Sequence, residues 1–396
     1  MTIRSLTEPL LASVILALAA CSSGPGTSED AGEEDVLDVR ELPPHDVIPD
    51  ADCGAGPGIL SVTGTFTPGA TVTIAGCTFG VKDPAPPLMW DRVDNQPEYT
   101  TLETGARVDT GDGLPWMANG GYSYVNNVKY YQGEDAHTPG GWAYWLPSTE
   151  APKGKGFLRG HGFELPDDSD FYVSWWYKVD NCTPADHSST KLLRIWPDES
   201  GVNGRMSWTF MQWMITDIWN ETDTTFSSVY STWWQGREPC DGTWSHYEAL
   251  FEYGGTTDNG IHGAATMLRD RQVRCASATG GEPTLCDHRY YEASGAFDQI
   301  WVIGLDISEP ERDSVEPTNT WFTEIYVDST QARVFVGNSA HFSSVSHFEH
   351  QIPVSWSEEE IQVEVNRGSF AEGDRSWLYV VDASGGHNPS GYPVTW

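Results

Sequence analysis

The strongest constraint on the fold is a two-residue alternation of side chains in the middle of the chain. In residues 171–180, Phe, Val, Trp, Tyr and Val alternate with Tyr, Ser, Trp and Lys, and residues 244–253 alternate in the same way. A period of two is typical of a β-strand, whereas a helix has a period of 3.6. Similar signals occur at 59–62, 70–74, 191–196, 206–215, 297–307 and 320–327. We therefore predict an all-β body of antiparallel strands.

The N-terminus predicts export and anchoring. Arg4 is followed by an apolar run over residues 10–20, which is too short for a permanent membrane span of about 20 residues. Leu18-Ala19-Ala20-Cys21 resembles the lipobox of bacterial lipoproteins, in which the cysteine becomes the lipidated first residue. The alternative is an ordinary secretory signal with an incidental cysteine. We expect a signal peptide over residues 1–20 and an exported protein, lipid-anchored through Cys21 to the bacterial outer membrane or cell surface.

Charge and composition limit the partners. Residues 21–52 are rich in Gly, Pro, Ser and acidic residues with Arg40 as the single cation, so we predict a disordered acidic tether. The whole chain has a formal net charge of −35. This charge argues against nucleic acid, because phosphates require cations. The 18 Trp, 16 Tyr and 14 Phe predict a large core or an aromatic ligand surface. We expect a monomer.

The cysteines agree with an oxidising compartment. Apart from Cys21 the chain has six, and an even number in an exported protein indicates three disulfides. Six cysteines allow fifteen pairings, so the sequence does not determine connectivity. Our preferred pairs are Cys53 with Cys77, Cys182 with Cys240, and Cys275 with Cys286.

The two ends of the body resemble parts of one domain family. Residues 58–80, with Thr-Val-Thr-Ile-Ala-Gly after a Pro-Gly turn, resemble the opening of an IPT/TIG immunoglobulin-like domain. Residues 332–382 resemble its later strands. Each piece is too short for the seven strands of such a sandwich. We therefore expect residues 53–87 plus 329–396 to form one split domain, with residues 88–328 inserted. The alternatives are two independent pieces, or a tail that packs onto the central region.

The central region resembles another family. The strands at 171–180, 244–253, 297–304 and 324–328 are similar in order and character to those of the concanavalin A-like lectin/glucanase jelly roll. That resemblance implies two antiparallel sheets with a concave ligand face. Lectins, glycoside hydrolases and polysaccharide lyases share the fold, so it favours a sugar ligand without selecting an activity.

Alternation on the expected sheet indicates which side chains point away from the core. An aromatic ring offers a flat apolar face to a sugar, and neighbouring charged groups bond its hydroxyls. The candidates for carbohydrate contact are Trp176, Lys178, Arg194, Trp196, His246 and Glu248. The alternative is that the tryptophans belong to a second packed layer and that the cations lie on the surface.

Catalysis is the second hypothesis. The paired carboxylates of a glucanase motif are absent, since Glu248 and Glu252 have the wrong spacing. A polysaccharide lyase needs a base and a group that neutralises the uronate carboxylate, and His246, Tyr247 and Arg194 could supply them. A third hypothesis is a structural or adhesion protein whose aromatic residues are all core.

Metal and cofactor motifs are not recognised. The turn at residues 109–113 has too few acidic residues for a calcium loop, so a structural calcium is unsupported. The group His341, His347, Glu349 and His350 matches no metal motif, and we interpret it as surface histidines. We therefore predict no metal and no cofactor, and a surface lipoprotein that binds polysaccharide or another glycan.

Overall fold

The structure is a computed structural model. It describes residues 53–54, 56–120, 128–147, 157–159, 170–180, 189–197, 205–211, 215–221, 232–233, 242–257, 260–273, 286–290, 297–303 and 319–396. The signal peptide, Cys21 and the acidic tether lie outside these residues. Apart from the 3-10 turn η3 (Phe342–Ser344), the regular elements of the described part are β-strands, so the all-β prediction is confirmed. None of its helices has the length and apolar character needed to cross a membrane.

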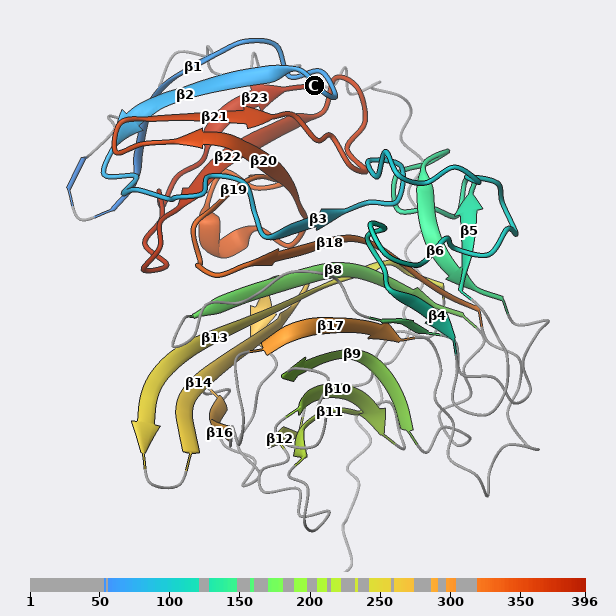
Figure 1. Cartoon of the computed structure of the whole chain (residues 1–396). Coiled ribbons are helices and arrows are strands. Elements are labelled where there is room, and N and C mark those ends of the chain that lie inside the picture. Colours follow the sequence, from blue (N-terminus) through green and yellow to red (C-terminus); the bar gives the residue numbers. More distant parts are fainter. Residues whose placement is uncertain are drawn as a thin grey trace, which may run out of the picture. The chain divides into compact units, whose positions relative to one another are not determined.

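Strands from both ends of the body share one seven-stranded sheet (Figure 1). Its order is β1 (Gly58–Thr63), β2 (Thr71–Cys77), β21 (Glu360–Glu364), β20 (Phe348–Trp356), β19 (Arg333–Gly337), β22 (Arg375–Val381) and β23 (Tyr392–Thr395). β2 pairs antiparallel with β21, with Val72 opposite Val363 and Ile74 opposite Ile361. These four side chains are fully buried in one core cluster with Leu378. The apolar positions of the two ends thus complete a common core. The domain boundaries and the IPT/TIG resemblance remain predictions.

One predicted disulfide is present at the start of this sheet. Cys53 and Cys77 are bonded, and their Cα atoms lie 5.8 Å apart. Cys77 ends β2 opposite Gly58 of β1, so the bond ties the segment before β1 to the end of the hairpin. The prediction for this pair is confirmed. The other four cysteines, Cys182, Cys240, Cys275 and Cys286, lie outside the described side chains, so their pairing remains a prediction.

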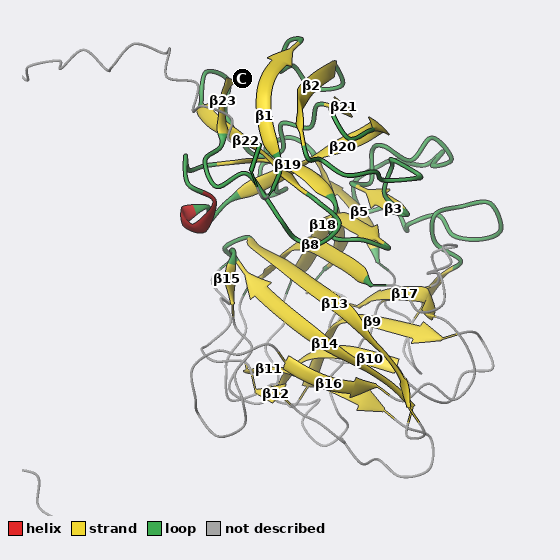
Figure 2. Cartoon of the chain, turned by 90° about the vertical axis from the view of Figure 1, so that its left-hand side faces the viewer, coloured by secondary structure: helices red, strands yellow, loops and turns green. Residues whose placement is uncertain are grey.

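Two antiparallel sheets form the central region, as expected for a jelly roll. The first runs β15 (Gln272–Val273), β14 (Gly260–Arg269), β13 (Ser245–Thr257), β8 (Phe171–Val179), β18 (Thr320–Asp328), β6 (Trp142–Leu146) and β5 (Lys129–Gln132), with β16 (Cys286–Tyr290) beside β14 and β3 (Met89–Asp91) beside β18. The second runs β12 (Thr232–Trp233), β11 (Ile215–Glu221), β10 (Arg205–Met211), β9 (Ser189–Pro197), β17 (Phe297–Ile303), β7 (Phe157–Arg159) and β4 (Ala118–Gly120). Figure 2 shows β8, β13 and β14 side by side in the first sheet. The single strand expected over residues 206–215 is wrong, because β10 and β11 pair there as a hairpin.

β8 shows why its alternating sequence is so aromatic. Both faces of the strand are buried. Trp175 stacks on Tyr247 of β13 with ring centroids 5.4 Å apart, and this face belongs to the apolar side of the first sheet. The opposite face carries Ser174 and Trp176 and is also covered. Because both faces of β8 are buried, the strand has no solvent-exposed polar face.

A buried ion pair joins the two places where the chain passes between the terminal and central sheets. Lys82 lies in the segment that leads from β2 to β3, and Asp328 ends β18 just before β19. Lys82 Nζ lies 2.9 Å from Asp328 Oδ2, and both side chains are at least 96% buried. Lys82 also donates to the carbonyls of Pro84, Ala85 and Pro86. The two crossing segments are therefore held together by a desolvated charge pair.

This pair predicts a specific pH dependence of stability. Burial raises the pKa of Asp328 from 3.8 to about 6, against the opposing charge of Lys82. A raised carboxyl pKa contributes stability that is complete below about pH 4 and is lost as the pH rises through about 6, by roughly 3 kcal/mol. We expect Asp328→Asn to remove this dependence, as measured by urea unfolding at several pH values between 4 and 7. Asp94→Asn, at an exposed carboxylate, should leave it intact. A profile for Asp328→Asn that runs parallel to the wild type would contradict the assignment.

Candidate functional site

Four of the predicted carbohydrate contacts share one face of the first central sheet. Trp176 lies opposite His246 in the pairing of β8 with β13, and Ser174 lies opposite Glu248. The exposed fractions are 4% for Trp176, 6% for Lys178, 1% for His246 and 1% for Glu248. Alternation therefore assigned the shared face correctly, but the side chains are not on an open surface.

The terminal sheet covers this face. Ser174 Oγ lies 2.8 Å from His350 Nε2 of β20. The rings of His246 and Phe348 meet at 4.4 Å, and Arg333 Nη2 of β19 lies 3.6 Å from Glu248 Oε2. The prediction that these side chains point outward to a ligand is therefore corrected. Alternation indicates which side chains share one face of a strand, but not whether another layer packs on that face. That these four side chains contact carbohydrate remains a prediction.

The other predicted site residues are placed as follows. Lys178 Nζ lies 3.2 Å from both the carbonyl and a carboxylate oxygen of Asp135, and 4.6 Å from the centre of the Trp321 ring. Tyr247 follows His246 in β13, so it points to the opposite, core side and stacks on Trp175. His246 and Tyr247, the two candidates for the base of a lyase, therefore lie on opposite faces of the sheet. The side chains of Arg194 and Trp196 lie outside the described part.

The group of His341, His347, Glu349 and His350 was expected on the surface, and this is wrong for two of the four residues. His341 is exposed, but Glu349 and His350 are 1% and 3% exposed. β20 inserts them between the terminal and central sheets, where His350 stacks on Tyr326 at 4.3 Å. Sequence spacing could not show this, because their partners come from distant segments such as the loop that carries His137.

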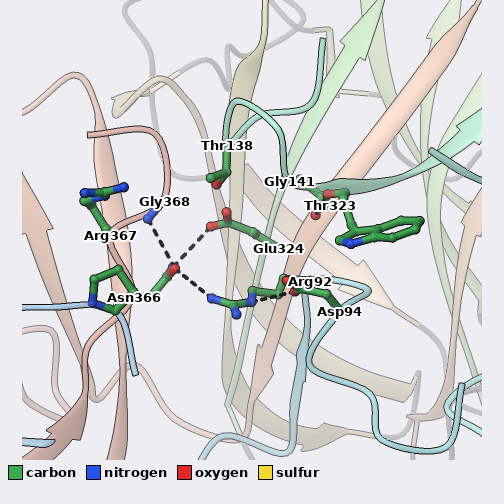
Figure 3. Close-up of a pocket in the computed structure, with 11 residues that line it drawn as sticks. Arg92, Asp94, Thr138, Gly141, Thr323, Glu324, Asn366, Arg367 and Gly368 are labelled. Carbon is green, nitrogen blue, oxygen red and sulfur yellow. Dashed lines mark hydrogen bonds and ion pairs between the residues drawn. The ribbon is translucent and has the colours of Figure 1, made fainter. Parts of the chain in front are cut away.

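A polar cavity lies beside this buried layer (Figure 3). Its volume is about 190 Å³, and its lining comes from five separate segments: Pro68; Arg92 and Asp94; Thr138, Gly141 and Trp142; Thr323 and Glu324; and Asn366, Arg367 and Gly368. None of these residues was a sequence candidate. Arg92 lies directly after β3, but no local sequence motif around it indicates a binding site.

Asn366 links the groups that line the cavity. Its Oδ1 accepts hydrogen bonds from Arg92 Nη1 at 3.4 Å and from the Gly368 N–H at 3.2 Å. Its Nδ2 donates to Glu324 Oε2 at 3.4 Å. Arg92 Nε donates in addition to Asp94 Oδ1 at 2.8 Å. Figure 3 shows Arg92 and Glu324 converging on Asn366. The arrangement fixes a guanidinium, an amide and a carboxyl group around one space.

Glu324 occupies a strained position in β18. Its φ is +53°, a left-handed conformation that costs a residue with a Cβ about 1–2 kcal/mol. The residue lies where the register of β18 against β8 shifts between Thr323 and Tyr326. Such bulges redirect side chains and are frequent beside functional sites. The bulge brings Glu324 to the cavity rather than leaving it in the regular alternation of the strand.

The charge of the cavity follows from burial. Desolvation, together with the neighbouring Glu349 carboxylate, raises the pKa of Glu324 well above its usual value. Burial therefore favours the uncharged form of Glu324. Two arginines, Arg92 and Arg367, line the cavity with Asp94 and Glu324, and because burial favours the uncharged form of Glu324, positive charge is favoured in the lining. This stands out in a chain whose formal net charge is −35.

Comparisons with known proteins give no family. No family model matches the chain, and no curated protein matches it. Among solved structures it is similar to an alginate lyase from Aplysia kurodai (TM-score 0.38, 8% identity, 58% of this chain and 100% of that chain), to the carbohydrate recognition domain of Emp47p (0.34, 10%, 58% and 92%) and to the cellulose induced protein Cip1 (0.32, 14%, 53% and 87%). All three TM-scores are below 0.5, so these likenesses assign neither a site nor an activity.

Proposed function

We propose that this chain is a lipid-anchored surface protein that binds carbohydrate, and that the cavity around Asn366 is its sugar site. The observation that supports it is the combination of one aromatic side chain, Trp142, with the convergent polar groups of Arg92, Asp94 and Asn366. Small-ligand sites typically combine an apolar wall with a few fixed polar groups. A volume of about 190 Å³ suits one monosaccharide unit better than a larger ligand.

The charge of the lining favours an acidic sugar. Arg92 and Arg367 line the cavity, and a guanidinium binds a carboxylate through paired hydrogen bonds. In its uncharged form, which burial favours, Glu324 can donate a hydrogen bond to the same group. A uronate unit of a polysaccharide therefore fits the cavity better than a neutral hexose. Anchoring through Cys21, export to the outer membrane or cell surface and the acidic tether of residues 22–52 belong to the same proposal and rest on the sequence.

The test is binding of defined oligosaccharides to the soluble form that starts at Ser22. We expect uronate-containing oligosaccharides to bind and Arg92→Ala to weaken that binding at least about tenfold, the effect of one lost charge-assisted hydrogen bond. Trp142→Ala should weaken it similarly, whereas Trp142→Phe keeps a ring and should lose less. Calorimetric titration measures each affinity.

A matched control is Arg375→Ala, which removes an exposed arginine that lies over Trp377 on the terminal sheet. It should bind as the wild type does. Equal loss in Arg375→Ala and Arg92→Ala would mean that attraction is non-specific and would overturn the site. Ultraviolet absorbance followed in the same samples detects unsaturated uronate, and its appearance would replace the binding function with a lyase activity.

A further inference from the structure

Three potential metal ligands meet close to the cavity, whose lining includes Thr138, the residue after His137, and Gly368, which lies against Glu349. His137 Nε2 lies 2.9 Å from Glu349 Oε1, and His347 Nε2 lies 3.1 Å from the same oxygen. One ligand atom from each residue lies within 4.8 Å of the other two. In a tetrahedral zinc site with bonds of about 2.0–2.2 Å, neighbouring ligand atoms lie about 3.3–3.5 Å apart. The two separations from Glu349 Oε1 are therefore within a few tenths of an ångström of those in such a site.

Burial makes a cation favourable at this point. The Glu349 side chain is fully buried, and within the described part of the chain its ion pairs are with His137 and His347 and not with a lysine or arginine. A buried carboxylate requires a compensating positive charge or metal. Glu324 adds a second buried carboxyl group next to Glu349. A divalent ion would compensate the buried negative charge of Glu349.

The surroundings orient the three ligands. Ser369 donates its backbone N–H to Glu349 Oε1 at 3.0 Å, and its Oγ lies 3.0 Å from that oxygen and 2.9 Å from His347 Nε2. The ring of His137 stacks on Trp176 with centroids 3.9 Å apart. Groups of this kind, which hold ligands in place, are a regular part of metal sites.

The site has access to solvent and an open fourth position. The His347 side chain is 28% exposed, whereas His137 and Glu349 are buried. An ion can therefore enter from the side of His347. Two histidines and one carboxylate leave one position of a tetrahedron for water or for the Ser369 hydroxyl. Imidazole ligands favour zinc and similar transition metals over calcium or magnesium, which prefer oxygen.

We propose that His137, His347 and Glu349 bind one divalent transition-metal ion of the zinc type. The ligands come from two regions. His137 lies in the loop between β5 and β6 of the central sheet, and His347 and Glu349 lie at the start of β20 in the terminal sheet. The ion thus cross-links the two sheets at the layer that covers Trp176.

The experiment titrates ZnCl₂ into the soluble form that starts at Ser22, freed of metal by chelator and carrying no histidine tag. We expect one equivalent to bind, with quenching or enhancement of the emission of Trp176, whose ring lies 5.0 Å from that of His347. CoCl₂ should give the strong visible absorption of four-coordinate Co²⁺, and an excess of CaCl₂ should not displace either ion.

Two ligand variants and one control decide the outcome. His347→Ala, at a partly exposed position where folding is retained, and Glu349→Gln, which keeps the side-chain shape, should each weaken zinc binding at least about 100-fold. Circular dichroism checks that both are folded. His341→Ala removes an exposed histidine outside the cluster and should bind as the wild type does. Absence of stoichiometric binding by the wild type would overturn the proposal, as would unchanged affinity in His347→Ala or equal loss in His341→Ala.

Discussion

Gly368→Ala is expected to lower the free energy of unfolding by about 3 kcal/mol, because a methyl group at this position has no space. Gly368 has a φ of +55°, and a Cβ built on it would overlap the carboxyl group of Glu349. That carboxyl group is held by His137 and Ser369 and cannot retreat without breaking their hydrogen bonds. Urea unfolding followed by circular dichroism measures the loss.

Gly373→Ala is the matched control. Its φ is +87°, so alanine is strained there as well, but no atom lies within 4 Å of the added Cβ. We expect it to lose only the conformational part, about 1 kcal/mol. The difference between the two variants measures the overlap with Glu349. Equal losses of stability in Gly368→Ala and Gly373→Ala would show that the position of the Glu349 carboxyl group does not require a glycine at position 368.

Asp91→Ala is expected to cost about 4 kcal/mol, the second large effect, through a buried hydrogen-bond network. Asp91 Oδ2 accepts from Tyr144 Oη at 2.7 Å and from Trp116 Nε1 at 2.9 Å, and Oδ1 accepts from the Val93 N–H at 2.8 Å. Asp91, Trp116 and Tyr144 are completely buried. The substitution removes the acceptor from three donors that water does not reach. Thermal and urea unfolding quantify the change.

Asp91→Asn tests the same network more gently. The amide keeps one oxygen as acceptor, so its loss should be less than that of alanine. Asp94→Ala, three residues along the chain, removes a carboxylate that is 36% exposed and pairs with Arg92, and should cost below about 1 kcal/mol. If Asp91→Ala were as mild as Asp94→Ala, the three hydrogen bonds would contribute little to stability.

The strands were predictable because their side chains obey a local rule. β8 was expected over 171–180 and runs over Phe171–Val179, and its two faces are those that alternation assigned. A second strand was expected over residues 244–253, and β13 runs over Ser245–Thr257. Cys53 and Cys77 were paired correctly because they flank one short hairpin. Strand identity and short-range pairing depend on neighbours in sequence, which a single chain displays.

The candidate site was not predictable, because the residues that form it are far apart in the sequence. His137 and Glu349 meet across a separation of 212 residues, and no spacing rule connects them. Trp176 and His246 are buried because β19 and β20 pack over their face of the sheet. The two-residue alternation of the sequence contains no information on that packing. Glu324 follows β-type residues in the sequence, yet its left-handed backbone arises from a bulge set by the pairing of β18 with β8. Each of these features belongs to tertiary contacts rather than to local pattern.

The pairing of β2 with β21 has a consequence for how the chain matures. Thr71 of β2 lies opposite Glu364 of β21, so the partner of the first hairpin leaves the ribosome long after the hairpin itself. Until then β2 presents an unpaired strand edge, which is prone to self-association. Pairing across so long a loop also makes folding slow. The Cys53–Cys77 bond can form within the hairpin before β21 is available. Early oxidation would therefore stabilise the hairpin of β1 and β2 while it has no partner strand. A C-terminal truncation that removes β21 would leave β2 permanently unpaired at this edge.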